Sequence, residues 1–79
     1  MKRERLTSER IKKRKERFEV AEDLDISEVY VRKLEAGTVK PGRDLMLKFA
    51  AYYKVNERKL FPDIFFALDD KKLIKTGTE

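Results

Sequence analysis

The sequence predicts an all-α domain, and three observations support this fold class. The 79 residues are enough for one domain with one modest core. Glycine and proline together occupy only five positions, and the segments between them are long and rich in helix-forming residues. No run of Val, Ile or Thr alternates with polar residues as in a strand, whereas apolar residues recur at intervals of three and four, as on one face of a helix.

The first predicted helix spans Thr7 to Lys15, and Thr7 or Ser8 is its expected N-cap. Leu6 and Ile11 are the only aliphatic residues available to anchor this helix in a core. The first helix is therefore expected to contribute little apolar surface beyond these two side chains.

Two short helices joined by a tight turn are predicted next, at Phe18 to Leu24 and at Glu28 to Ala36. The hydroxyl of Ser27 can accept a hydrogen bond from an amide in the first turn of the third helix, and Gly37 suits a left-handed C-cap. The apolar residues that recur at helical spacing in this pair are Phe18, Val20, Ala21, Leu24, Tyr30, Val31 and Leu34.

The rest of the chain predicts two more helices and a polar tail. A fourth helix spans Arg43 to Tyr53, and Asn56 is the expected N-cap of a fifth helix from Glu57 to Phe61, which Pro62 interrupts. The predicted domain covers residues 1–68, and residues 69–79 form the tail. The buried face expected for the fourth helix consists of Met46, Phe49, Ala50 and Tyr53.

The spacing of the second and third helices favours a helix-turn-helix. Because Ala21 is small, the third helix can approach the second closely. Apolar residues at Ile26, Val31 and Leu34 would hold the pair against the rest of the domain. The outer face of the third helix would then be free to enter the major groove of DNA.

The residue inventory argues against an enzyme. Without cysteine or histidine the chain has no thiolate nucleophile, no histidine acid or base and no zinc site of the usual kind. We find no glycine-rich phosphate loop and no paired-carboxylate cleft, so we expect no catalytic site, metal or cofactor. No apolar run approaches the ~20 residues that span a bilayer, and no apolar stretch follows the basic N-terminus as in a signal peptide, so we expect a cytoplasmic protein without a membrane partner.

Positive charge is concentrated at the N-terminal end. The whole chain has a formal net charge of +5, and residues 2–17 hold nine Lys or Arg against three Glu. The remainder of the chain is close to neutral. Such asymmetry indicates a polyanionic partner, although a solvated, lysine-rich first helix would look the same.

The segment from Phe18 to Phe61 resembles, without gaps, the lambda-repressor-like, Cro-type family of helix-turn-helix domains, also called the XRE family. Residues 26–37 are similar to the recognition helix of that family, with Tyr30 and Val31 at its packing positions. Glu35, Ala36 and Gly37 reproduce the family's closing Glu-x-Gly, and the remaining matches lie at Lys40, Pro41, residues 45–53, Val55, Leu60 and Phe61.

The sequence departs from the family pattern in three places. Residues 14–17 stand where the family has a glycine-containing turn followed by Ser or Thr and Gln. Asp25 replaces the glycine of the turn between the two helices, and aspartate tolerates left-handed geometry. Glu9 stands where the first helix of the family has a buried aliphatic residue.

The resemblance implies double-stranded DNA as the partner. In this reading Glu28 accepts from a cytosine amine, Val29 packs on thymine methyl groups, and Arg32 reaches guanine or phosphate. Arg17 matches the position at which the family clamps a backbone phosphate. The expected DNA-contacting residues are Arg17, Ser27, Glu28, Val29, Arg32, Lys33, Lys40 and Arg43.

Two further groups of residues are expected to support binding. Arg10 and Glu35 match a partly buried, structural ion pair between the first helix and the recognition helix. Near the C-terminus, apolar residues exceed what the edge of so small a core needs, so we interpret them as a homodimer interface, the alternative being that they fold back onto the core. These residues are Ile64, Phe65, Phe66 and Leu68.

Two functions from different classes remain open. The first is a sequence-specific regulator, of the phage- or mobile-element-repressor type, that binds an inverted-repeat operator as a homodimer, with a separate effector or antirepressor protein as a possible partner. The second is a helix-turn-helix-fold protein-interaction module or an antitoxin component. It is motivated by the acidic residues near the presumed DNA face, Glu22, Asp23, Asp25 and Glu28.

Overall fold

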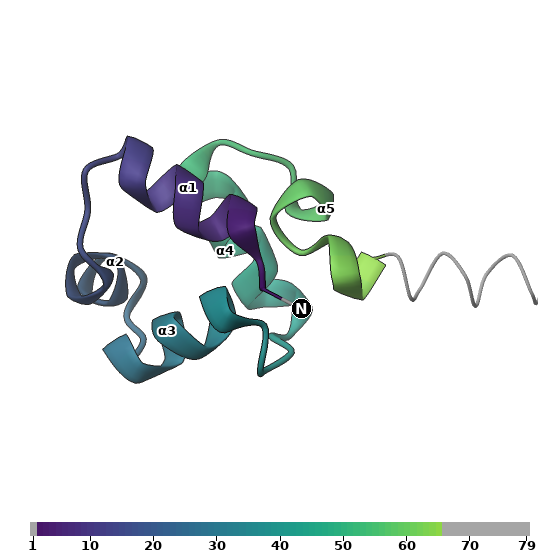
Figure 1. Ribbon diagram of the computed structural model, residues 1–79, viewed down its shortest axis with the longest axis horizontal. Helices are drawn as coiled ribbons and strands as arrows, with labels where there is room; N and C mark the ends of the chain where they lie inside the picture. Colours follow the sequence, from purple (N-terminus) through teal and green to yellow (C-terminus); the bar gives the residue numbers. More distant parts are fainter. Residues whose placement is uncertain (1, 66–79) are drawn as a thin grey trace, which may run out of the picture.

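The computed structural model describes residues 2–65, and the regular structure of this part of the chain is helical throughout. The predicted all-α fold is therefore confirmed. In Figure 1, α1 lies at the top, α3 at the bottom, α4 behind them, and α5 at the right. The helices are α1 (Glu4–Lys12), α2 (Arg17–Leu24), α3 (Glu28–Ala36), α4 (Arg43–Tyr53) and α5 (Glu57–Leu60), followed by a helical turn at residues 62–65.

One apolar core receives side chains from all five helices. Leu34, Leu60 and Phe61 have no exposed surface, and the rings of Phe49 and Phe61 meet edge to face with centroids 6.0 Å apart. Edge-to-face packing suits the charge distribution of aromatic rings. The buried apolar residues are Leu6, Val20, Ala21, Leu24, Val31, Leu34, Met46, Phe49, Tyr53, Leu60 and Phe61.

The first helix differs from the prediction in both its limits and its anchors. It begins at Glu4, three residues before the predicted start, so Thr7 and Ser8 lie inside it and neither caps it. Leu6 is buried as expected, but the expectation for Ile11 was wrong, because 60% of this residue is exposed. The start of α1 is instead held by tertiary contacts of Arg3, the residue that precedes it.

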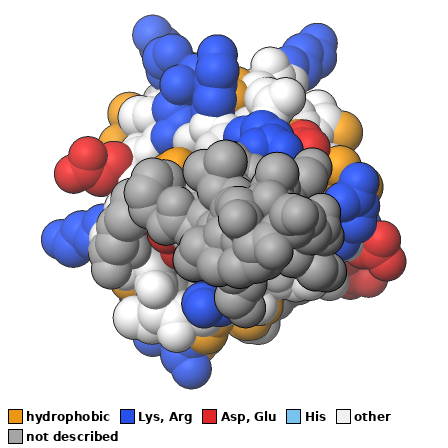
Figure 2. Space-filling model, turned by 90° about the vertical axis from the view of Figure 1, so that its right-hand side faces the viewer, with side chains coloured by type: hydrophobic (Ala, Val, Ile, Leu, Met, Phe, Trp, Pro, Cys, Tyr) orange, Lys and Arg blue, Asp and Glu red, His pale blue; other side chains and the backbone are white. Residues whose placement is uncertain are grey.

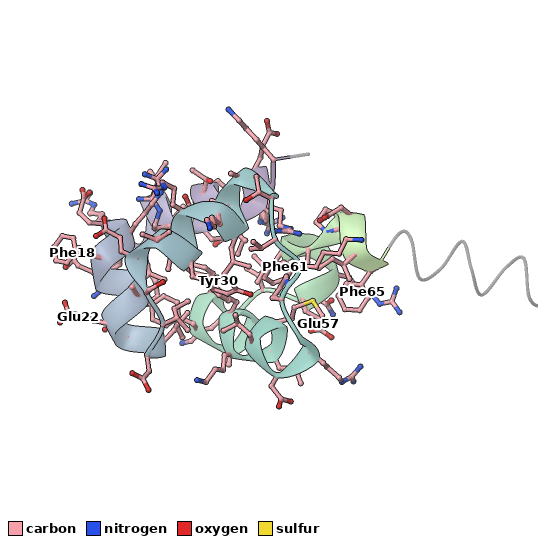
Figure 3. The ribbon with its side chains drawn as sticks, turned by 90° about the horizontal axis from the view of Figure 1, so that it is seen from below. Phe18, Glu22, Tyr30, Glu57, Phe61 and Phe65 are labelled. Carbon is pink, nitrogen blue, oxygen red and sulfur yellow. The ribbon has the colours of Figure 1, made fainter. Side chains whose placement is uncertain are left out.

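The second helix begins at Arg17, one residue before the predicted start, because Glu16 and Glu19 form a capping box. Phe18 shares the helical spacing of the apolar residues of α2 but does not join the core. Its side chain is 51% exposed, and Figure 3 shows the ring pointing outward at the end of the molecule formed by α2. Val20, Ala21 and Leu24 supply the buried face instead.

The turn and the third helix follow the prediction closely. Asp25 adopts a left-handed conformation, with φ 57° and ψ 49°, so it does the work of the family's turn glycine. The Oγ of Ser27 accepts a hydrogen bond from the amide of Tyr30 at 3.0 Å. Gly37 ends α3 with φ 79°, a value that favours glycine because a side chain would be strained there.

The last elements agree with the prediction except at their ends. The fourth helix has the predicted limits, and the fifth ends at Leu60, one residue early, with the Asn56 side chain accepting from the amide of Arg58. Ile64 and Phe65 are half-buried and pack against the core. Phe66 and Leu68, and the predicted boundary between domain and tail, lie outside the described residues.

Candidate nucleic-acid interface

The third helix presents one exposed polar face and one buried face. Val31, Leu34 and Glu35 are buried against the rest of the domain, so the residues between them point outward. The exposed residues of α3 are Glu28, Val29, Arg32, Lys33 and Ala36. Four of these five belong to the expected DNA-contacting set, and their spacing places them on one side of the helix.

The turn before α3 adds Ser27 to this face. Ser27 is exposed, and as the N-cap it stands where the backbone amides of the first turn of α3 point outward. Its oxygen already accepts from Tyr30, so the hydroxyl proton is what it can offer to an acceptor outside the protein. A phosphate or a base edge supplies such an acceptor.

Arg32, Lys40 and Arg43 are exposed cations on α3 and in the chain that follows it. Lys40 lies in the loop that follows α3, and Arg43 is the first residue of α4. None of the three forms an ion pair with another residue in the described part of the chain. Their charges are therefore available to an anion outside the protein.

Arg17 has a different environment from the one its sequence position suggested. Its Nε donates to the Oε1 of Glu35 at 3.0 Å, although the side chain remains 42% exposed. Arg17 therefore contributes to holding α2 against α3. A guanidinium has five N–H donors, so this bond uses only one of them.

The predicted structural ion pair is present. The Nε of Arg10 donates to the Oε2 of Glu35 at 2.7 Å, and both side chains are at most 10% exposed. The Nη1 of Arg10 also donates to the carbonyl of Lys15, which ties the loop between α1 and α2 to the same centre. Because Arg17 also bonds to Glu35, this one carboxylate joins α1, α2 and α3.

A groove of about 470 Å³ runs between α1 and α3 beside the exposed face of α3. Residues at positions 4, 7, 8 and 11 form one wall, at the spacing of a single face of α1, and residues 32, 35 and 36 form the other. Arg17 and Lys2 complete the lining, so the structure brings Arg17 and Arg32 to one surface. No motif in the sequence predicts this groove or the part that Lys2 plays in it, because its two walls meet only in the folded chain.

Exposed apolar side chains accompany the cations. Ile11 lies in the groove and is more exposed than any other large apolar residue described, and Val29 on α3 is 48% exposed. Ile11 was expected in the core, and no local pattern distinguishes it from a core residue. Its exposure follows from the orientation of α1, which depends on long-range contacts.

The outer side of α2 is fastened to α4 by a polar contact. The hydroxyl of Tyr52 donates to the carboxylate of Asp23, and the Nζ of Lys15 lies 3.6 Å from that carboxylate. The hydrogen bond from Tyr52 is the main reason that the pKa of Asp23 lies below its ordinary value. Asp23 thus has structural partners in Tyr52 and Lys15.

The distribution of charge over the surface agrees with the sequence. Figure 2 shows Lys and Arg side chains gathered along its upper edge, which is the side on which α1 lies in Figure 1. Glu9, which stands at the family's aliphatic position, is buried and accepts from the Nε of Arg5 at 2.8 Å. That hydrogen bond lowers the pKa of Glu9 and outweighs the opposing effect of burial.

Within residues 2–65 there is no group of three or more His, Cys, Asp or Glu placed to hold a metal ion. No helix in the same part of the chain is both long enough and apolar enough to cross a membrane. The outer face of α3 and the groove beside it carry Lys2, Arg17, Arg32 and Lys33 together with the carboxylates of Glu4, Glu28 and Glu35. Glu35 is already paired with Arg10 and Arg17, and the cations outnumber the carboxylates, so the surface is suited to binding an anion.

A model of the helix-turn-helix family matches residues 9–60, which is more than half of the 79-residue chain. The matched segment begins in α1 and ends with α5, so it contains the whole unit of α2, turn and α3. No curated protein and no solved structure matches the chain.

Proposed function

The chain belongs to the XRE-type, lambda-repressor-like helix-turn-helix family of DNA-binding regulators, and from this membership we propose that it is a sequence-specific transcriptional repressor of the phage or mobile-element type. The observation that carries the proposal is the outer face of α3, where Val29 and Arg32 are exposed and Arg32 has no ion-pair partner among the described residues. Arg17 lines the groove beside this face, so two arginines lie on one surface. A helix face that served only to contact solvent would not need this arrangement.

In the proposed complex, α3 lies in the major groove and reads base edges. Val29 packs on thymine methyl groups, Arg32 bonds to guanine or phosphate, and Glu28 excludes sequences that offer no donor. Ser27, Lys33, Lys40 and Arg43 contact the sugar-phosphate backbone and set the position of the protein along the duplex. Arg17 contributes a phosphate contact through the guanidinium donors that Glu35 does not use.

We further propose that the protein binds as a homodimer to an inverted repeat. Ile64 and Phe65 leave part of their surface exposed next to the core, so a second copy could cover them together with Phe66 and Leu68. Two copies related by a two-fold axis would read half-sites about one helical turn apart. Such a repressor would act in the cytoplasm and could be controlled by a separate effector or antirepressor protein.

The proposal is tested by selecting binding sites from random-sequence DNA at about 0.15 M salt, a concentration that suppresses non-specific binding. The wild-type protein is compared with a Val29→Ala, Arg32→Ala double variant. The matched control is a Leu47→Ala, Lys59→Ala double variant, which removes an exposed apolar residue and an exposed cation from α4 and α5. We expect the wild type and the control to enrich one palindromic motif and the α3 variant to lose it.

Enrichment of the same motif by the α3 variant would contradict reading by α3. Enrichment of a single half-site in place of a palindrome would leave sequence reading intact and refute the homodimer. If no protein enriches any motif, the proposed function fails.

A second candidate, a protein-interaction module or antitoxin component, is favoured by the groove between α1 and α3. Ile11 exposes 60% of its surface there, and an apolar side chain has little to gain from a phosphate. A salt titration separates the two functions, because DNA affinity falls steeply as salt rises whereas apolar contacts do not weaken. An Ile11→Ser variant should retain DNA binding under the first function and lose its partner under the second.

A further inference from the structure

Arg3 is a buried arginine that joins three segments distant in the sequence, and only 1% of it is exposed. Its Nη1 donates to the carbonyl of Leu34 at 2.8 Å. Its Nε and Nη2 donate to the two carboxylate oxygens of Asp63 at 3.1 and 3.0 Å. The guanidinium also lies over the ring of Phe61, 5.5 Å from the ring centroid.

The contacts of Arg3 with α3 lie at the C-terminal end of that helix. Leu34 belongs to its last turn, and the backbone amide of Arg3 donates to the next carbonyl, that of Glu35, at 2.9 Å. The last four carbonyls of a helix have no intrahelical partner, and a cation there is favoured by the helix dipole. Arg3 therefore binds the end of α3 with both its backbone and its charge.

The contact of Arg3 with Asp63 lies at the start of the helical turn formed by residues 62–65. Burial alone would raise the pKa of Asp63, but the hydrogen bonds and charge of Arg3 outweigh burial and lower it. Asp63 is therefore ionised at neutral pH. Because two parallel hydrogen bonds join the guanidinium of Arg3 to the carboxylate of Asp63, they fix the relative orientation of the two groups as well as the distance between them.

We infer that Arg3 and Asp63 are positioning residues for α3, and that they make base reading depend on the segment that begins at residue 62. This inference rests on the proposed function, because it concerns how α3 is oriented when it reads DNA. Hydrogen bonds to base edges tolerate little misalignment, whereas flexible cations on phosphates tolerate more. A small shift of the C-terminal end of α3 should therefore weaken binding to the selected operator and spare binding to unrelated DNA.

The test measures the ratio of the affinity for the selected operator to the affinity for a scrambled duplex of the same length. Asp63→Asn keeps the shape of the side chain and removes its charge, and Arg3→Lys keeps the charge and removes the planar fork. The matched control is Glu9→Gln, which also removes an ion-paired, buried carboxylate, but one whose partners, Arg5 and Lys12, both lie in α1. We expect both positioning variants to lower the ratio about tenfold and Glu9→Gln to change it by less than about twofold.

The same measurement distinguishes a variant that unfolds from a variant that folds with α3 misplaced. A partly unfolded protein loses affinity for both duplexes equally, so the ratio stays unchanged. Because Asp63 acts on α3 through Arg3, the double variant should lower the ratio no further than Arg3→Lys alone. If Asp63→Asn does not fold, Asp63→Glu, which retains the charge but moves it by one methylene, is expected to lower the ratio less but measurably.

A second readout does not involve DNA. Residual dipolar couplings of backbone amides report the orientation of α3 relative to α4, and we expect Asp63→Asn to change it and Glu9→Gln to leave it as in the wild type. An unchanged ratio together with an unchanged orientation would overturn the inference. A changed orientation in a protein whose wild type prefers no DNA sequence would refute the proposed function and leave the positioning role in place.

Discussion

The carboxylate of Glu35 in α3 is shared by two arginines, one from α1 and one from α2. Arg10 approaches it at 2.7 Å and Arg17 at 3.0 Å, and Glu35 itself is almost completely buried. The pair with Arg10 could be predicted from the sequence because it follows the family motif. The bond from Arg17 could not, because it depends on the rotamer that Arg17 adopts where α2 meets α3.

Replacing Glu35 with glutamine should destabilise the protein by about 3–5 kcal/mol, because a buried arginine loses its counter-charge. The free energy of unfolding in urea measures this change. The control is Glu28→Gln on the exposed side of the same helix, which should change stability by no more than about 0.5 kcal/mol. Equal effects of the two substitutions would show that the Glu35 network contributes nothing to stability.

Stability should also depend on pH through Asp63, whose pKa is lower in the folded protein than its ordinary value of 3.8. Above that ordinary value the carboxylate is ionised in both states, so its full contribution is present. As the pH falls further, the unfolded chain binds the proton first, and the contribution is lost by the time the pH passes the folded pKa. The Asp63→Asn variant should therefore be less stable than the wild type near neutral pH.

The same comparison at low pH provides the check. The difference in unfolding free energy between the wild type and Asp63→Asn should shrink as the pH falls below about 4. A difference that stays constant from neutral to acid pH would mean that Asp63 does not act through its charge.

At the scale of helices, the prediction was accurate where local signals mark both ends. The limits of α3 agree with the prediction because Ser27 and Gly37 are recognisable caps. The limits of α1 do not, because its start depends on Arg3, whose partners lie 31 and 60 residues away. The exposure of Ile11 and Phe18 has the same origin. Helical spacing shows that apolar residues share a face, but tertiary contacts decide which face of the helix packs against the core.

The cap at Gly37 yields a prediction for the stability of this element. Gly37→Ala should lower the free energy of unfolding by about 1 kcal/mol, because alanine is strained at φ 79°. Gly37→Asn is the matched comparison, because asparagine adopts positive φ more readily than alanine. The urea midpoint should fall further for Gly37→Ala than for Gly37→Asn, and equal midpoints would contradict the role of Gly37 as the cap.

At the scale of the whole molecule, the fold and the helix-turn-helix could both be predicted, because they follow from caps, helical spacing and a family motif. The groove and the contacts of Arg3 could not. The groove forms where α1 meets α3, and Arg3 meets Asp63 only in the folded chain. The exposed face of α3 depends on both kinds of information. Local signals in the sequence define the helix, and buried contacts in the folded chain hold it with Val29 and Arg32 pointing outward.

The central claim is that this face reads DNA sequence, and one equilibrium measurement tests it directly. Binding of the selected operator and of a scrambled duplex is measured at about 0.15 M salt for the wild type and for Arg32→Ala. We expect the wild type to bind the operator at least about a thousandfold more tightly than the scrambled duplex. We expect Arg32→Ala to lose about 1–3 kcal/mol of binding free energy for the operator and little of its affinity for the scrambled duplex. Equal wild-type affinity for the two duplexes, or an Arg32→Ala variant that binds the operator as the wild type does, would contradict the account.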